Sequence, residues 1–175
     1  EPEVSSLAVR MEVELPRPLP PGRHVTLFLD YTLNLPHIEP GAEFVKGTFG
    51  YSKQSVSLGN WYPVMAPYRE QENKGWYGQT YFPVGDPYVT EVADYEVTIT
   101  TTEGVIIAGT GVETRDGNRW HFVADQARSF AFAASNQYDV ATTQVGGVTV
   151  SSYYFPAHQD AGEAALQTAA QAIEL

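Results

Sequence analysis

The chain has 175 residues and carries 10 Lys and Arg against 21 Asp and Glu, which gives a formal charge of -11. This excess of acid disfavours nucleic acid and anionic membranes as partners, because both require a basic surface. Hydrophobic residues make up 43% and aromatic residues 13%, which excludes a disordered chain. No apolar run approaches the roughly 18 residues of a membrane span, so we expect no membrane insertion.

The chain contains no cysteine, which removes disulfides, thiolate nucleophiles and cysteine-ligated metal sites. Its absence fits a secreted or cell-envelope protein and a cytosolic one equally, so the compartment stays open. The chain opens at Glu1 without an initiator Met, and it stops at Leu175 inside a helical pattern that has no stop signal. These ends predict a domain excised from a longer protein.

From Leu7 to Tyr154 the dominant period of the hydrophobic pattern is two, which is typical of half-buried strands. Turn signals such as Pro20-Pro21-Gly22, Asp116-Gly117-Asn118 and Gly146-Gly147 separate the apolar runs. We expect strands at 6–15, 23–35, 43–51, 54–62, 89–101, 104–110, 112–116, 118–125, 129–135, 138–145 and 147–155. The sequence therefore predicts an all-β fold, an antiparallel β-sandwich that occupies residues 1–156.

Residues 63–87 lack this alternation and combine Pro and Gly with the clustered charges Glu70, Glu72 and Lys74. We expect a long ordered loop, and such loops in compact domains are usually functional or docking elements. Aromatic side chains crowd the same quarter of the chain, and they are either a platform for sugar rings or anchors of a core or interface. The second interpretation is favoured. These residues are Trp61, Tyr62, Tyr68, Trp76, Tyr77, Tyr81 and Tyr88.

After Pro156 the composition changes, and residues 157–175 contain seven Ala. This predicts a C-terminal linker helix at 157–175. Ala161, Ala165, Leu166, Ala169 and Ile173 recur at spacings of three and four, which gives a narrow apolar face suited to packing against another body.

Motifs that carry chemistry are absent. The chain has neither HExxH nor GxSxG, and Gly109-Thr110-Gly111 lacks the third glycine and the helix of a dinucleotide loop, so a strand bend or bulge is favoured there. The acidic pairs Glu70/Glu72 and Glu91/Asp94 could serve a glycosidase, but solvated charge is the favoured interpretation. No two histidines have the spacing of helical metal ligands, so hydrogen-bonded or exposed roles are favoured; they are His24, His37, His121 and His158. We expect no catalytic residue, metal ligand or cofactor in this chain.

Several segments together resemble the amino-terminal domain of aminopeptidase N and its relatives, the gluzincin zinc aminopeptidases. Residues 81–87 (YFPVGDP) and the strand at 93–99 are similar to the family's "FPCFDEP … atFdvti" passage. Residues 15–35 are similar to its first strand pair, 58–63 (LGNWYP) to the "GNWyP" of a prokaryotic branch, and 127–132 (ARSFAF) to its "aRDFAF" strand. The Ala-rich helix matches the segment that leads into the family's catalytic domain.

The resemblance implies a saddle-like β-sandwich that covers one side of a thermolysin-like catalytic domain and closes part of its substrate cleft. In the family a Gln or Glu reaches the α-amino group of the substrate, and Gln71 and Glu72 lie nearest to that position. Glu70 and Gln79 of the same loop complete the substrate-contact candidates. Zinc, its two His and the general-base Glu would lie beyond Leu175. The expected partners are therefore a catalytic domain of the same chain and the N-terminus of a peptide substrate.

A second hypothesis stays open, in which the chain is a free-standing binding module. The most plausible ligand of such a module is a carbohydrate stacked on Trp61, Trp76 and Tyr77.

Overall fold

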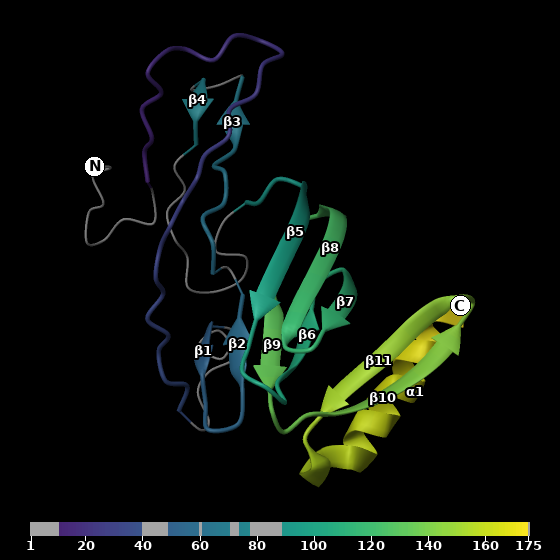
Figure 1. Cartoon of the computed structure of the whole chain (residues 1–175). Coiled ribbons are helices and arrows are strands. Elements are labelled where there is room, and N and C mark those ends of the chain that lie inside the picture. The colour runs from purple at the N-terminus through teal and green to yellow at the C-terminus, as the bar shows by residue number, and fades with distance from the viewer. Residues whose placement is uncertain (1–10, 40–48, 60, 71–73, 78–88, 175) are drawn as a thin grey trace. The chain divides into compact units, whose positions relative to one another are not determined.

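The computed structural model describes residues 11–39, 49–59, 61–70, 74–77 and 89–174 (Figure 1). The chain divides into two compact units. One comprises Glu1–Asn34 and Pro63–Glu91, and the other comprises Leu35–Tyr62 and Val92–Leu175.

The second unit contains antiparallel sheets, an isolated parallel bridge between His37 and Tyr51, and a C-terminal helix. A four-stranded sheet has the order β1-β2-β9-β6, with β1 at Phe49–Tyr51, β2 at Val56–Leu58, β9 at Phe132–Ser135 and β6 at Ile106–Gly109. A three-stranded sheet has the order β5-β8-β7, with β5 at Ala93–Thr100, β8 at Arg119–Ala127 and β7 at Val112–Asp116. Strands β10 (Asp139–Val145) and β11 (Val148–Tyr154) pair with each other. The prediction of a mainly β fold with a C-terminal helix is confirmed.

Two hairpins form where the turn signals predicted them. In the β7–β8 hairpin Asp116 pairs with Arg119, so the loop is Gly117-Asn118, and Gly117 has a φ of 59°. In the β10–β11 hairpin both Gly146 and Gly147 have positive φ, as a two-residue loop of the primed type requires. These loops set the register of each pair of strands.

The core of this unit takes side chains from both larger sheets. Trp120 and Phe122 of β8 are buried together with Ile107 of β6, Ala134 of β9 and Phe130. Alternate β8 residues face away from the core and are more exposed. The period-two pattern around residues 118–125 therefore predicted the buried face correctly.

Tyr62 fixes the chain at Phe130. The backbone N–H of Phe130 donates to the Tyr62 hydroxyl oxygen over 2.7 Å. Burial, reinforced by a hydrogen bond with Tyr95, raises the pKa of Tyr62 to about 12. The phenol is therefore neutral throughout the physiological range.

Gly109-Thr110-Gly111 carries the chain out of β6 and into β7, which confirms the predicted bend. A side chain at Gly109 would collide with the ring of Phe122, so only glycine fits there. Thr110 binds Ala131 through backbone and side chain, because both its N–H and its hydroxyl donate to the Ala131 carbonyl.

A bulge in β8 assigns a structural role to Asp94. The register shifts between Ala93 and Tyr95, and Gln126 of β8 takes a φ of 51°. The Asp94 carboxylate accepts the Gln126 backbone N–H over 2.8 Å. Asp94 thus holds a backbone conformation that L-residues rarely adopt.

The helix α1 (Gln159–Glu174) follows a short 3₁₀ turn, η2, at Pro156–His158. It packs along the β10–β11 hairpin (Figure 1). The residues buried on the hairpin are Gly162, Leu166 and Ala170. Of the predicted apolar face only Leu166 is among them, and packing of that face against another body stays a prediction. Ala161, Ala165, Ala169 and Ile173 are exposed, because the helix approaches the hairpin through the gap left by Gly162 at Tyr154.

The strands expected at 6–15 and 23–35 are not formed within the described residues. Residues 11–15 and 23–35 contain no strand, and the alternate apolar side chains Val25, Leu27 and Leu29 are exposed. Alternation marks one apolar face, but a strand also needs a neighbouring backbone to pair with. Residues 6–10 of the first expected strand lie outside the described residues. The same holds for residues 43–48 of the strand expected at 43–51.

The predicted loop at 63–87 contains a short antiparallel pair, β3 (Tyr68–Arg69) and β4 (Gly75–Trp76), in the first unit. Residues 71–73 and 78–87 of this stretch lie outside the described residues. No helix in the described part of the chain is long and apolar enough to cross a membrane.

Replacing Gly162 with Ala should destabilise the protein by about 1–3 kcal/mol, because the added methyl group would overlap the Tyr154 ring. This is opposite in sign to the usual gain of about 1 kcal/mol for Ala over Gly in a helix. Urea denaturation would measure the change, with the exposed Gln167→Ala as a control. A more stable Gly162→Ala variant would show that the helix does not pack closely on the hairpin.

Replacing Tyr62 with Phe should cost about 1–3 kcal/mol, because the Phe130 N–H loses its acceptor. The raised pKa adds a pH dependence. The folded state holds the Tyr62 phenolic proton more tightly than the unfolded state does. Its contribution to the free energy of unfolding is therefore at its maximum below pH 10 and is lost as the pH rises toward about 12.

Chemical denaturation of wild type and Tyr62→Phe between neutral pH and pH 12 would test this. The variant should lose less stability over the alkaline interval. Tyr68→Phe, at an exposed tyrosine, should retain the wild-type alkaline dependence. Parallel alkaline profiles for wild type and Tyr62→Phe would contradict the assignment.

Candidate functional site

The β3–β4 pair presents a set of exposed aromatic and cationic side chains in the first unit. Tyr68 pairs with Trp76 across the two strands, and their rings meet edge to face at 5.2 Å. The Arg69 guanidinium lies 3.6 Å from the centre of the Tyr77 ring. We call Tyr68, Arg69, Trp76 and Tyr77 the aromatic hairpin.

The backbone fixes the aromatic hairpin in place. Gly75 lies opposite Arg69 with a φ of 142°, a conformation that suits glycine. The Tyr77 N–H donates to the Pro67 carbonyl over 2.9 Å, which extends the pairing by one step. Trp76 is 64% exposed and Tyr68 is 49% exposed. The rings are thus ordered against one another and open to solvent, as a binding surface requires.

Glu70 follows directly after Arg69 and is exposed. It is the one substrate-contact candidate that the structure describes, and it lies beside the aromatic hairpin in sequence. The other candidates, Gln71, Glu72 and Gln79, lie outside the described residues, as do Tyr81 and Tyr88.

Trp61 and Tyr62 have a different role from the aromatic hairpin. Trp61 packs edge to face on Phe132 at 5.8 Å, and its indole Nε1 is buried. Tyr62 packs on Tyr95 at 5.7 Å. Trp61 packs against the core of the second unit and is partly buried, so its place in a sugar-stacking platform stays a prediction.

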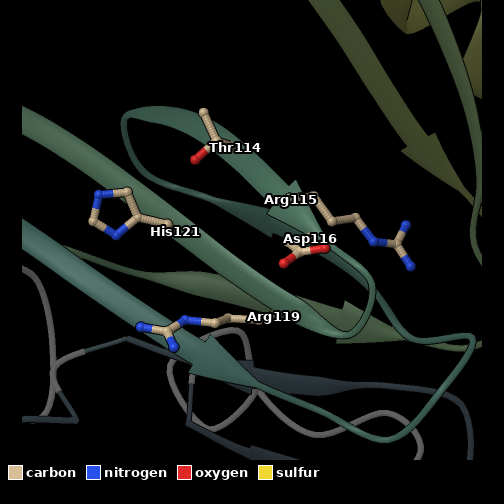
Figure 2. A pocket seen from close by; sticks show the side chains of 5 residues that line it. All are labelled: Thr114, Arg115, Asp116, Arg119 and His121. Atoms are coloured by element: carbon tan, nitrogen blue, oxygen red, sulfur yellow. The ribbon is translucent and has the colours of Figure 1, made fainter.

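A second candidate lies on the outer face of the β7–β8 hairpin, where a hollow of about 390 Å³ is lined by Thr114, Arg115, Asp116, Arg119 and His121 (Figure 2). Strand pairing places Thr114 beside His121 and Asp116 beside Arg119. Figure 2 shows Arg115 extending away from His121 and Arg119. Its guanidinium lies 4.3 Å from the centre of the Trp120 ring, and its Nε donates to the Gly117 carbonyl.

His121 is partly exposed and held by neighbours on β5. Its Nδ1 lies 3.3 Å from the Thr98 hydroxyl, and its Nε2 lies 3.8 Å from the Glu96 carboxylate. This confirms the predicted hydrogen-bonded role. The hollow combines cationic, acidic and hydroxyl side chains on an open sheet face.

Glu113 of β7 has a perturbed carboxyl group. Burial raises its pKa above the usual range, and the neighbouring Arg115 opposes that rise. The residue as a whole is exposed, so the shielding concerns the carboxyl end. Within the described ranges, no three His, Asp or Glu side chains are grouped closely enough to hold a metal ion.

No protein-family model matches the chain, and no curated protein or solved structure matches it. The functional assignment therefore depends on the residues and their geometry. Sequence reasoning identified the aromatic residues of the hairpin but missed Arg69, whose stacking on Tyr77 depends on the β3–β4 register. It also missed that Arg119 and His121 of β8 line the same hollow, although their spacing of two in a strand was a signal.

Quenching of tryptophan fluorescence by acrylamide would test the geometry of the aromatic hairpin. The chain has three Trp. Trp76 is 64% exposed, whereas Trp120 is 3% exposed and the indole nitrogen of Trp61 is buried. Trp76→Phe should therefore remove most of the quenchable emission, and Trp61→Phe should leave it. Equal quenching of both variants would contradict an exposed Trp76.

Proposed function

We propose that the chain is a non-catalytic domain of a zinc metallopeptidase similar to aminopeptidase N. In this proposal it is a saddle-like β-sandwich that packs on a catalytic domain and forms part of the substrate cleft. Zinc, its two His ligands and the general-base Glu belong to that catalytic domain. Support comes from the similar segments that follow one another in the family's order, at 15–35, 58–63, 81–87, 93–99 and 127–132.

The aromatic hairpin is the observation that carries this proposal. Monomeric domains rarely leave several large aromatic side chains exposed together unless another surface covers them. Tyr, Trp and Arg are also the residues enriched at the energetic centres of interfaces. Trp76, Tyr68 and Arg69 provide these three types on one pair of short strands.

The charge of the chain is consistent with a role in holding peptide substrates. The N-terminus of a peptide is a cation, and a cleft wall with a formal charge of -11 would attract it. Glu70, exposed beside the aromatic hairpin, supplies a carboxylate that can accept a hydrogen bond from an ammonium group.

The coding sequence downstream of Leu175 provides the simplest test. The proposal requires HExxH on a helix, followed about twenty residues later by a Glu ligand. A downstream sequence without this motif would contradict the peptidase assignment and leave the description of the aromatic hairpin unchanged.

In the full-length protein, we expect Glu70→Gln to reduce kcat/KM for peptides with a free N-terminus. A hydrogen bond to a charged group is worth about 1.5–3 kcal/mol, so the loss should be roughly ten- to a hundredfold. Peptides with an acetylated N-terminus lack the cation, so their turnover should change little. Gln71→Ala, Glu72→Ala and Gln79→Ala test the other three candidates in the same assay.

Glu103→Gln provides the matched control, because Glu103 is an exposed carboxylate in the turn after β5, in the other unit. It should leave both substrates at wild-type rates. If all four loop variants behave like Glu103→Gln, the loop does not hold the substrate amine. The domain assignment would then depend on the downstream motif alone.

A carbohydrate-binding module is the second candidate, and the exposure of Trp76 favours it. One face of Tyr77 is covered by the Arg69 guanidinium, which leaves Trp76 as the open ring. Calorimetric titration of the 175-residue chain with soluble oligosaccharides separates the two candidates. Binding that disappears in Trp76→Ala would favour the carbohydrate module, whereas absence of binding favours the peptidase domain.

A further inference from the structure

Within the described residues, the outer edge of strand β7 pairs with no other strand. This strand is the outermost one of the sheet β5-β8-β7, and all five of its residues are exposed, although the carboxyl end of Glu113 is partly shielded. Asp116 and Arg119 close a two-residue hairpin loop, so this pair exchanges backbone hydrogen bonds across the ladder. Hydrogen-bonded and non-hydrogen-bonded pairs alternate along an antiparallel ladder. The N–H and C=O groups of Glu113 and Arg115 therefore point away from β8.

These outward backbone groups are available for pairing. Among the residues that the structure describes, none makes a hydrogen bond to the backbone N–H or C=O of Glu113 or Arg115. Edge strands with such groups are templates for a further strand, and natural proteins usually protect them with charged side chains. On β7 the charges have an order that makes the edge complementary to itself.

We propose that β7 pairs antiparallel with β7 of a second copy of this chain, with Thr114 on the two-fold axis. In that register Glu113 lies opposite Arg115 of the second copy, and Arg115 lies opposite its Glu113. Each pair exchanges backbone N–H and C=O groups and sets opposite charges side by side. A two-fold interface requires this kind of self-complementary patch.

The local structure leaves Arg115 able to take part. Its Nε is used by the Gly117 carbonyl, and its guanidinium lies over Trp120. The two terminal nitrogens of the guanidinium are further donors that suit a carboxylate. The stack on Trp120 also restricts the side chain, which lowers the entropy lost when the pair forms.

A five-residue edge buries little surface, so the dimer is weak and depends on concentration. Sedimentation velocity of the 175-residue chain, up to millimolar loading, should show a reversible monomer–dimer equilibrium. Glu113→Arg and Arg115→Glu each place like charges opposite one another, and each should weaken association at least about tenfold. The double variant Glu113→Arg/Arg115→Glu should restore it, because the pairs become complementary again.

Mixing the two single variants gives the sharpest test. One then presents two Arg and the other two Glu along the edge, so they should form a mixed dimer more readily than either variant alone. Lys53→Glu, an exposed site outside β7, has the same charge change as Arg115→Glu. Mixed with Glu113→Arg, it controls for overall attraction and should show no such gain.

The outcomes that overturn the proposal are distinct from those that test the peptidase assignment. A chain that is monomeric at all concentrations has no such edge pairing. Equal association of wild type and both single variants, or a double variant that stays monomeric, places any dimer contact elsewhere. Thermal melts of each variant confirm that the hairpin is folded, because loss of the Arg115 contacts alone would lower the melting temperature without changing association of the folded protein.

Discussion

The packing around Phe130 is the constraint on which the second unit depends. Its side chain is fully buried and meets Phe122 at 5.7 Å and Trp61 at 6.5 Å, so it joins residues that are distant in sequence. Its backbone N–H is satisfied by the Tyr62 hydroxyl, which a buried amide requires. Non-directional burial and one directed hydrogen bond thus act at the same residue. The chain between Phe130 and β9 then continues to Ala131, which Thr110 holds at the bend between β6 and β7.

Local patterns predicted much of this unit. Alternation identified the buried face of β8, and glycine dipeptides identified the β10–β11 turn, because both signals act through neighbouring residues. Features that depend on distant partners were not predictable. Residues 23–35 alternate as a strand would but form no strand with any part of the chain that the structure describes. Apart from Leu166, the residues by which α1 packs on its own hairpin were not predicted, because Gly162 meets Tyr154 and a glycine has no apolar side chain that would mark it as an interface.

The candidate site was predictable to the same extent. Composition located the aromatic residues of the stretch 63–87, but it could not distinguish those in the core from those on the surface. Trp61 and Trp76 are the same residue type at either end of one segment, and only pairing separates them. Trp61 packs on Phe132, whereas Trp76 packs on Tyr68 at an exposed pair of strands. Arg69 gained its position over Tyr77 through the β3–β4 register, which no local pattern encodes.

The net charge of the chain affects the two proposed contacts in different ways. A formal charge of -11 makes two copies of the chain repel one another at long range. Close cross-strand pairs between Glu113 and Arg115 act over a few ångströms, where dissolved salt screens them less than it screens the long-range repulsion, since the screening length is about 8 Å at physiological ionic strength. Raising the ionic strength from very low values should therefore first strengthen the pairing of β7 edges. The same salt should weaken the attraction of a cationic peptide terminus toward the acidic chain from the outset, because that attraction acts over the longer distance. Added salt should thus at first strengthen the pairing of two β7 edges and weaken the binding of a cationic peptide terminus. This difference distinguishes a contact between close charge pairs from an attraction due to the net charge of the chain.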